Sequence, residues 1–247
     1  MANYLKSEIY RLARKRALYV FWAVCALAPV LMTMFTAAYG TERYANTEFV
    51  FKVTTGSWSM IFFVVPVVVS LLLMDEFADG TLKNTAAYGI SRSKVFYGKW
   101  ILELAVLAVA WVVTYISLTA SVFLLLTNNG TSNFTDFNTS ILGVLPLTLA
   151  ALAVSHCLCF LIENTLTHLV SYAVLIIVLP ELYYLLAEGM PALQEIVNNV
   201  PLFPYAAAND LAWLKSDGML LCWAVGMGYM LIAFLISSKP VMRKEYK

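Results

Sequence analysis

Two groups of residues have side chains of the types that bind metal ions or carry out redox chemistry. His156 and His168 flank Glu163, and together they offer two imidazoles and one carboxylate. A zinc site takes four ligands in a defined geometry, and these three residues supply too few in an uncertain register. Cys157 and Cys159 are spaced as C-x-C, which is neither the redox C-x-x-C motif nor a zinc pattern. We therefore predict no metal site and interpret the cysteines as small apolar residues of helices.

The single Gly-Lys pair, Gly98-Lys99, tests whether the chain binds ATP. A P-loop has the pattern G-x-x-x-x-G-K-[ST]. Here Trp100 follows the lysine, and Ser93 stands where the first glycine is needed. A glycine-spaced dinucleotide motif is also missing, so we expect no cofactor on this chain. An intramembrane enzyme or electron-transfer subunit would need paired histidines, carboxylates or serines inside a bundle, and the sequence offers no such set. We predict that the chain is not an enzyme.

The most polar stretch is "MDEFADGTLKNTAAYGISRSKVFYGKW", residues 74–100. Asp79 or Thr81 can begin a short helix there, and Gly89 can end it. Ser91 is a good N-cap for a second helical start. Two antiparallel spans could be joined by far fewer residues than residues 75–99 provide. We therefore predict that the stretch forms a short helix, one side of which packs against a partner protein.

Composition places this stretch in a very apolar chain. Of the 247 residues, 61% are hydrophobic and 13% are charged, whereas a soluble domain averages roughly 45–50% apolar and about 25% charged residues. So little charge cannot cover a soluble globule of this size, and the class is a multi-pass membrane protein. The net charge of +1 gives no reason to expect nucleic-acid binding.

Long apolar runs predict a single all-α domain with six membrane-spanning helices, because a span takes about 20 apolar residues. Before them, Leu5, Ile9 and Leu12 recur at helical spacing, so residues 1–16 are predicted to form an amphipathic helix in the membrane interface. The alternative is that its cations only set topology. A cleaved signal peptide is disfavoured because the first apolar run exceeds the roughly 7–15 residues of such peptides. The predicted spans are Ala17–Tyr39, Gly56–Met74, Trp100–Leu126, Ser140–Ile162, Leu169–Ala187 and Met219–Ser237.

The positions of lysine and arginine predict the orientation, because these residues concentrate in cytoplasmic segments. The N-terminal tail, residues 75–99 and the C-terminal tail together hold thirteen of the sixteen, and the opposite side holds Arg43, Lys52 and Lys215. Both termini and residues 75–99 are therefore predicted to be cytoplasmic. The thirteen are Lys6, Arg11, Arg14, Lys15, Arg16, Lys83, Arg92, Lys94, Lys99, Lys239, Arg243, Lys244 and Lys247.

The stretch "DEFADGTLKNTAAYGISRSKVFYGKW" resembles the first intracellular loop of ABC-2 type permeases, the membrane subunits of a class of ATP-driven exporters. In that family an acid-x-x-x-G-T-L segment and an I-S-R…K segment flank this loop. The amphipathic N-terminus, the six spans and the internal termini are similar as well. The resemblance implies the ABC-2 (type V exporter) fold. The chain length is similar to that of small bacteriocin-immunity, bacitracin-resistance and peptide-export permeases.

The resemblance also implies that residues 75–99 are a coupling loop that docks on a nucleotide-binding subunit. Alternatively, Arg92 and Lys99 bind lipid phosphates. A second, smaller contact would lie at 163–168, where no lysine or arginine is present. The residues that carry over are Glu76, Asp79, Gly80, Thr81, Leu82, Lys83, Asn84, Ile90, Ser91, Arg92, Lys94 and Lys99.

The expected function is therefore the permease subunit of an ATP-binding cassette exporter in the bacterial cytoplasmic membrane. ATP and Mg would be bound by two copies of a separate ABC ATPase, and a second permease chain, identical or related, would complete the transporter beside the membrane lipids. The first expectation for the substrate is an amphipathic antimicrobial or cytolytic peptide. A drug or a lipid-linked saccharide is an alternative substrate. A membrane scaffold or sensor partner is the alternative outside the family.

Overall fold

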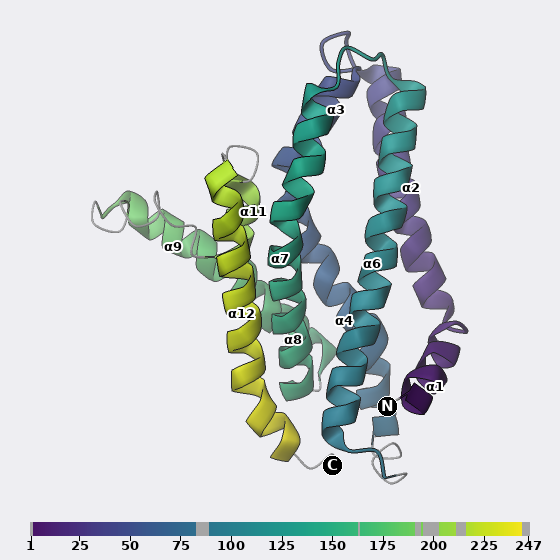
Figure 1. Ribbon diagram of the computed structural model, residues 1–247, viewed down its shortest axis with the longest axis vertical. Helices are drawn as coiled ribbons and strands as arrows, with labels where there is room; N and C mark the ends of the chain where they lie inside the picture. The colour runs from purple at the N-terminus through teal and green to yellow at the C-terminus, as the bar shows by residue number, and fades with distance from the viewer. Residues whose placement is uncertain are drawn as a thin grey trace.

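The computed structural model describes residues 2–82, 89–162, 164–190, 194, 203–210 and 216–243. The described chain is built of helices, six of which are long and apolar enough to cross a membrane (Figure 1). The predicted all-α fold with six spans is confirmed. In chain order the elements are α1 (Ala2–Leu12), α2 (Arg16–Tyr39), α3 (Thr47–Gly56), η1 (Trp58–Met60), α4 (Ile61–Ala78), α6 (Arg92–Leu125), α7 (Ser132–Leu161), α8 (Thr165–Ala173), η2 (Val174–Val178), α9 (Leu179–Glu188), α11 (Pro204–Asp210) and α12 (Ser216–Arg243).

The segment between the second and third spans is shorter than the predicted residues 75–99. Helix α4 continues past Met74 to Ala78, and α6 begins at Arg92 rather than near Trp100. The connection is therefore residues 79–91, and glycines with positive φ stand near both its ends, Gly80 at 65° and Gly89 at 77°. The prediction ended the spans where charges begin, but several of these charges pair inside the protein and belong to the helices.

Other element ends also move relative to the prediction. Helix α7 begins at Ser132 and not Ser140, and its first turn is tied to α3, where the backbone N–H of Ser132 donates to Glu48 Oε1 at 3.0 Å. Helix α1 ends at Leu12, short of residue 16, where a turn leads into α2.

Helix α7 is the centre of the bundle. It packs against α12, α4 and α3, and its buried face is rich in small residues such as Gly143, Ala150 and Ala151. Small residues let helix backbones approach closely in a membrane, where apolar association alone gives little driving force. The main core joins α4, α6 and α7 with side chains of α1, α8 and α12.

The two termini lie at the same end of the bundle. Figure 1 shows α1, the start of α6 and the end of α12 at the bottom, whereas α3 and the connections after α2 and α6 are at the top. At the top end the backbone N–H of Thr47 donates to the carbonyl of Thr127 at 3.0 Å, which ties the two connections together. A second apolar cluster, which includes Phe51, Val122 and Phe137, fills this end.

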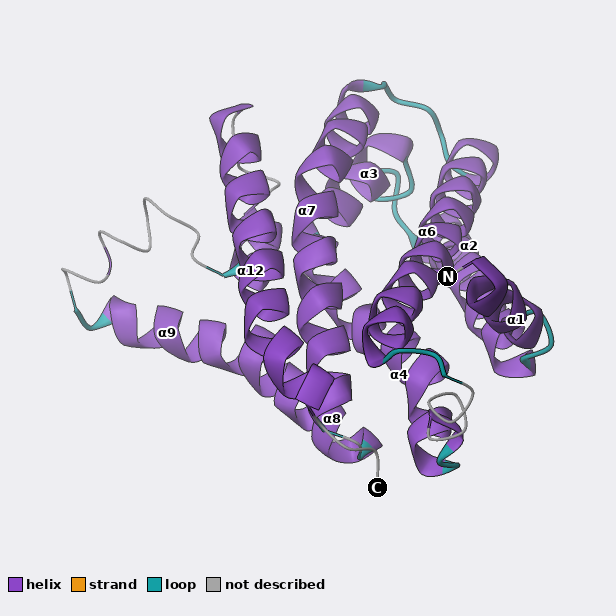
Figure 2. Cartoon of the chain, turned by 60° about the horizontal axis from the view of Figure 1, so that its bottom comes forward, coloured by secondary structure: helices purple, strands orange, loops and turns teal. Residues whose placement is uncertain are grey.

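The fifth span is bent. Its middle, η2, is a π-helical segment just before Pro180, the second residue of α9. Proline has no N–H to donate to the preceding turn, so the helix changes its hydrogen-bond pattern there. Figures 1 and 2 show α9 extending away from α7 and α12.

Candidate functional site

An ion network joins three helices at the end of the bundle that carries the termini. Glu76, in the last turns of α4, is 4% exposed, and Lys99 of α6 is 1% exposed. The Lys99 ammonium pairs with the Glu76 carboxylate and also donates to Glu8 Oε2 of α1 at 2.5 Å. Two long helices and the N-terminal helix therefore meet at a buried lysine.

Helix α1 contributes a second cation to the same carboxylates. Arg11 Nη2 donates to Glu8 Oε2 at 2.7 Å and also pairs with Glu76. Just beyond α1, Lys15 Nζ contacts Asp75 Oδ2 at 2.6 Å and donates to the carbonyl of Leu71. We call Glu8, Arg11, Lys15, Asp75, Glu76 and Lys99 the α1 ion network.

The α1 ion network is balanced, with three acids and three bases. Its members differ in burial: the side chain of Asp75 is 70% exposed, whereas that of Glu76 is 5% exposed. Removing one partner of a buried pair costs about 3–5 kcal/mol, because the other charge is left uncompensated. An exposed pair contributes about 0–1 kcal/mol. The buried Glu76–Lys99 contact therefore joins α4 to α6, and the pairs of Lys99 with Glu8 and of Arg11 with Glu76 fix α1 against them.

The sequence comparison supplies the family. The family described as ABC-2 family transporter protein matches residues 4–179, which is more than half of the chain and includes the whole α1 ion network.

This chain belongs to the ABC-2 transporter family.

It is thus a membrane component of a transporter, and family membership implies an ABC ATPase partner in general terms. No curated protein gives a significant match to the sequence.

The residues predicted to contact the ATPase of this ABC-2 chain differ in their burial. Glu76, Leu82 and Lys99 are buried within the chain. Their side chains therefore pack against the neighbouring helices and are not part of the surface that an ATPase could contact. The exposed members are Asp79, Ser91 and Lys94. Gly80, Thr81, Ile90 and Arg92 are half-buried. Lys83 and Asn84 lie outside the described residues.

The connection is anchored to the ends of α4 and α6. Thr81 Oγ1 donates to the carbonyl of Glu76 at 3.4 Å, and Ile90 packs against the main core. Ser91 stands at the N-cap of α6 with extended backbone, but its side chain makes no capping hydrogen bond. The predicted cap position is therefore confirmed, while the capping hydrogen bond expected of a serine there is not formed.

The resemblance placed a second, smaller ATPase contact at residues 163–168. The structure describes all of these residues except Glu163. Asn164 caps α8 by accepting from the backbone N–H of Thr167 at 3.1 Å. His168 is fully buried, and its Nε2 lies 3.0 Å from the carbonyl of Ser155. A carbonyl only accepts, so Nε2 carries the proton and joins α8 to α7.

A buried acid–histidine pair was missed by the sequence analysis. Glu103 of α6 and His156 of α7 are both fully buried, and His156 Nδ1 lies 2.9 and 2.8 Å from the two carboxylate oxygens. The rings of Phe96, Trp100 and Phe160 surround the imidazole, with centroids 4.5, 5.5 and 4.9 Å away. The pair therefore links the third span to the fourth span through a polar contact that is surrounded by aromatic side chains.

One sequence signal could have suggested part of this arrangement. Glu103 follows Lys99 by four residues, so both lie on one face of α6. Charges that share a helix face inside an apolar segment must find partners, because an unpaired charge in the membrane is costly. The identity of the partners depends on the packing of α1 and α7, which spacing alone does not give.

Proposed function

We propose that this ABC-2 chain is the permease subunit of an ATP-driven exporter and that its ATPase docks at the end of the bundle that carries the termini. The observation that carries the proposal is that the family match, over residues 4–179, covers the first four spans and residues 79–91. The exposed side chains of Asp79, Ser91 and Lys94 would form the contact with the ATPase.

The buried part of the predicted site gives this contact a rigid base. Glu76 and Lys99 lie just before and after the connection, and both are tied to α1. A force applied to residues 79–91 would therefore reach α4, α6 and α1 together. ATP binding shifts the equilibrium between conformations only if the ATPase contacts the connection differently in the two states. The bundle would then move largely as a rigid body.

The orientation and partners follow from the same proposal. This end, with both termini, faces the cytoplasm of a bacterial cell, in agreement with the excess of lysine and arginine there. Six spans make half of a translocation unit, so two permease chains, identical or related, would pair over two ATPase subunits that hold ATP and Mg.

The proposed substrate is amphipathic or hydrophobic, with an antimicrobial or cytolytic peptide as the first candidate. Lys99, Glu103 and His156 are charged or polar groups buried within the described spans, and each is paired inside the protein. A substrate that approaches the helices from the membrane therefore meets apolar surface. This favours a substrate with an apolar face.

The docking proposal is tested with a charge reversal at Lys94. The full chain is co-expressed with ABC ATPases from the same genome, and association and stimulated ATP hydrolysis are measured in detergent or nanodiscs. Lys94→Glu is expected to weaken association at least tenfold, about 1.4 kcal/mol. Lys94 is a better target than Thr81 or Arg92, because those two have further contacts within the chain.

The matched control is Lys52→Glu. Lys52 is also an exposed lysine, but it lies on α3 at the opposite end of the bundle. This variant is expected to bind and stimulate the ATPase as the wild type does. Equal association by both variants, with both correctly inserted, would reject docking of the ATPase at the surface formed by Asp79, Ser91 and Lys94.

A further inference from the structure

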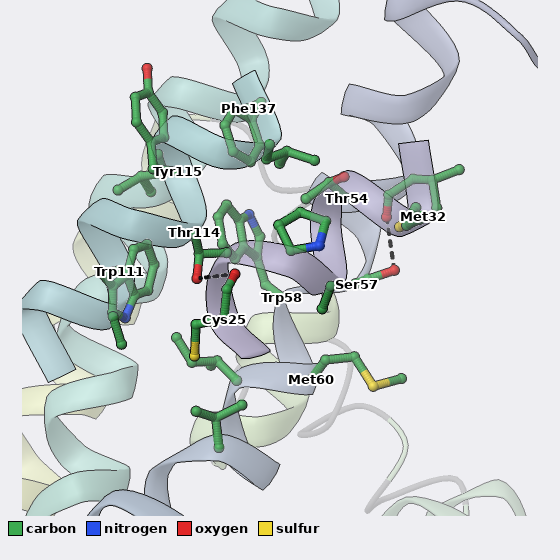
Figure 3. Close-up of a pocket in the computed structure, with 18 of the residues that line it drawn as sticks. Cys25, Met32, Thr54, Ser57, Trp58, Met60, Trp111, Thr114, Tyr115 and Phe137 are labelled. Atoms are coloured by element: carbon green, nitrogen blue, oxygen red, sulfur yellow. Dashed lines mark hydrogen bonds between the residues drawn. The ribbon is translucent and has the colours of Figure 1, made fainter. Parts of the chain in front are cut away.

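A cavity of about 490 Å³ lies between four of the spans, toward the α3 end of the bundle. Ligand sites typically have volumes of about 300–1,000 Å³. The cavity is bounded by α2, the α3–η1 segment, the start of α4, α6 and the start of α7 (Figure 3). It is remote from the α1 ion network, which lies at the other end of the bundle.

Stacked aromatic rings form one wall of the cavity. Trp58 of η1 stacks on Trp111 of α6 at 5.5 Å and on Phe137 of α7 at 5.3 Å, with interplanar angles of 17° and 12°. Tyr115 stacks on Phe137 with an angle of 5° between the rings. Because Trp58 and Phe137 each stack on two other rings, this wall is preformed, and a guest would not have to order it.

Polar groups along the cavity are already bonded to the protein. Thr114 Oγ1 donates to the carbonyl of Cys25 at 3.3 Å, and Ser57 Oγ donates to the carbonyl of Val53 at 2.8 Å; both bonds are drawn in Figure 3. The indole N–H of Trp58 donates to Ser140 Oγ at 2.7 Å. With these donors engaged, the cavity presents hydrocarbon and ring faces. A polar guest would lose hydrogen bonds to water there without replacing them.

The cavity opens to the surface that faces lipid. Met32 of α2 and Met60 of η1 line it and are 43% and 63% exposed, whereas Ala110 and Leu118 deeper inside are 2% and 4% exposed. Helix α2 has only Leu18 and Thr33 fully buried among its residues and packs mainly on α6, so its other side leaves a lateral entrance.

We propose that this cavity binds one acyl chain of a membrane phospholipid, which enters sideways between α2 and η1. The bilayer's hydrocarbon is the medium at the entrance, and methylene groups match the lining. A helix of a second copy is a poor occupant: a helix is about 10 Å wide with a 5.4 Å pitch, so the cavity holds roughly one turn. A flexible acyl chain, which is much narrower than a helix, can enter and fill this volume without any movement of the surrounding helices. This proposal requires only that the chain spans a membrane, and it does not depend on where the ATPase docks.

The acyl-chain site can be tested with a photoreactive lipid. The full chain is reconstituted in nanodiscs of phosphatidylcholine containing a fraction with a diazirine halfway along one acyl chain. After irradiation, lipid adducts are mapped by peptide mass spectrometry. We expect adducts on the cavity side chains Trp58 and Trp111, in addition to adducts on outward residues of α12 such as Leu231 and Leu235, which report contact with bulk lipid.

Matched variants distinguish lipid labelling inside the cavity from labelling on the outer surface of the bundle. Ala28 lines the cavity on α2, whereas Ala23, also exposed on α2, does not. Ala28→Phe should lower the cavity adducts at least fivefold and leave those on α12 unchanged, and Ala23→Phe should change neither. Met60→Trp, at the exposed entrance, provides a second blocking variant if Ala28→Phe folds poorly.

Two results would overturn the proposal. One is a lack of adducts on the cavity residues while α12 is labelled, and the other is an equal cavity yield in the blocked and control variants. If Ala28→Phe binds the ATPase as the wild type does, the outcome of the lipid test does not affect the proposal for where the ATPase docks.

Discussion

At the scale of residues, charge near a span end has two different uses in this chain. Glu76 and Lys99 belong to a stretch that looks like a docking motif, yet both are buried and paired with α1. Lys94, only five residues before Lys99, is exposed. The difference is one of helix face: α6 turns Lys99 toward α1 and α4 and leaves Lys94 outside. The pairs hold the helices, and the exposed residues remain available for a partner.

Glu76→Gln is expected to destabilise the protein by about 3 kcal/mol, because Lys99 and Arg11 lose the carboxylate they share in a buried site. Thermal unfolding in detergent can be followed with a thiol-reactive dye, since Cys157, Cys159 and Cys222 are buried and react on unfolding. Asp75→Asn is the control, and it should cost about 1 kcal/mol or less because the side chain of Asp75 is 70% exposed. Equal losses in the two variants would contradict the assigned roles.

At the scale of elements, the contact between α12 and α7 depends on one glycine. A Cβ placed on Gly226 would lie 2.5 Å from the backbone carbonyl of Pro146, whereas a Cβ on Gly228 would meet nothing within 4 Å. Both glycines fit the small-residue pattern of membrane helices, and the sequence does not distinguish between them. Only the position of α7 shows that Gly226 is in the contact and that Gly228 is not.

Gly226→Ala should therefore force α12 away from α7 and lower the unfolding temperature by several degrees, a loss of about 1–3 kcal/mol from overpacking. Gly228→Ala should be neutral or slightly stabilising, because alanine is the better helix former by about 1 kcal/mol. The same dye assay measures both variants. A larger loss in Gly228→Ala than in Gly226→Ala would show that the contact between these helices is placed incorrectly.

At the scale of the whole molecule, the bundle has two different ends. One carries α1, the α1 ion network and the start of α6, and the other carries α3 and the apolar cluster around Phe51. Lys52 and Lys94 are exposed at these opposite ends. The proposed orientation places Lys94 in the cytoplasm and Lys52 outside the cell.

Labelling of single introduced cysteines tests this orientation. With a membrane-impermeant maleimide, Lys52→Cys should react in intact cells, and Lys94→Cys should react only after the membrane is permeabilised. The wild type gives the background from Cys25 and the buried thiols. The opposite pattern would invert the proposed orientation, and reaction of both positions from one side would contradict the six-span arrangement.

The sequence by itself determined the properties that depend on composition and period: a multi-pass helical membrane protein, six spans, an amphipathic first helix and the family resemblance. The helical spans follow because a run of about 20 apolar residues can satisfy its backbone hydrogen bonds in lipid only by forming a membrane-spanning helix. Tertiary structure alone decided which charges are internal. Glu76, Lys99, Glu103 and His156 find partners up to 91 residues away in the chain, and such pairs depend on how α1, α4, α6 and α7 pack. The acyl-chain cavity is likewise a space between helices, and no single segment of the sequence encodes it.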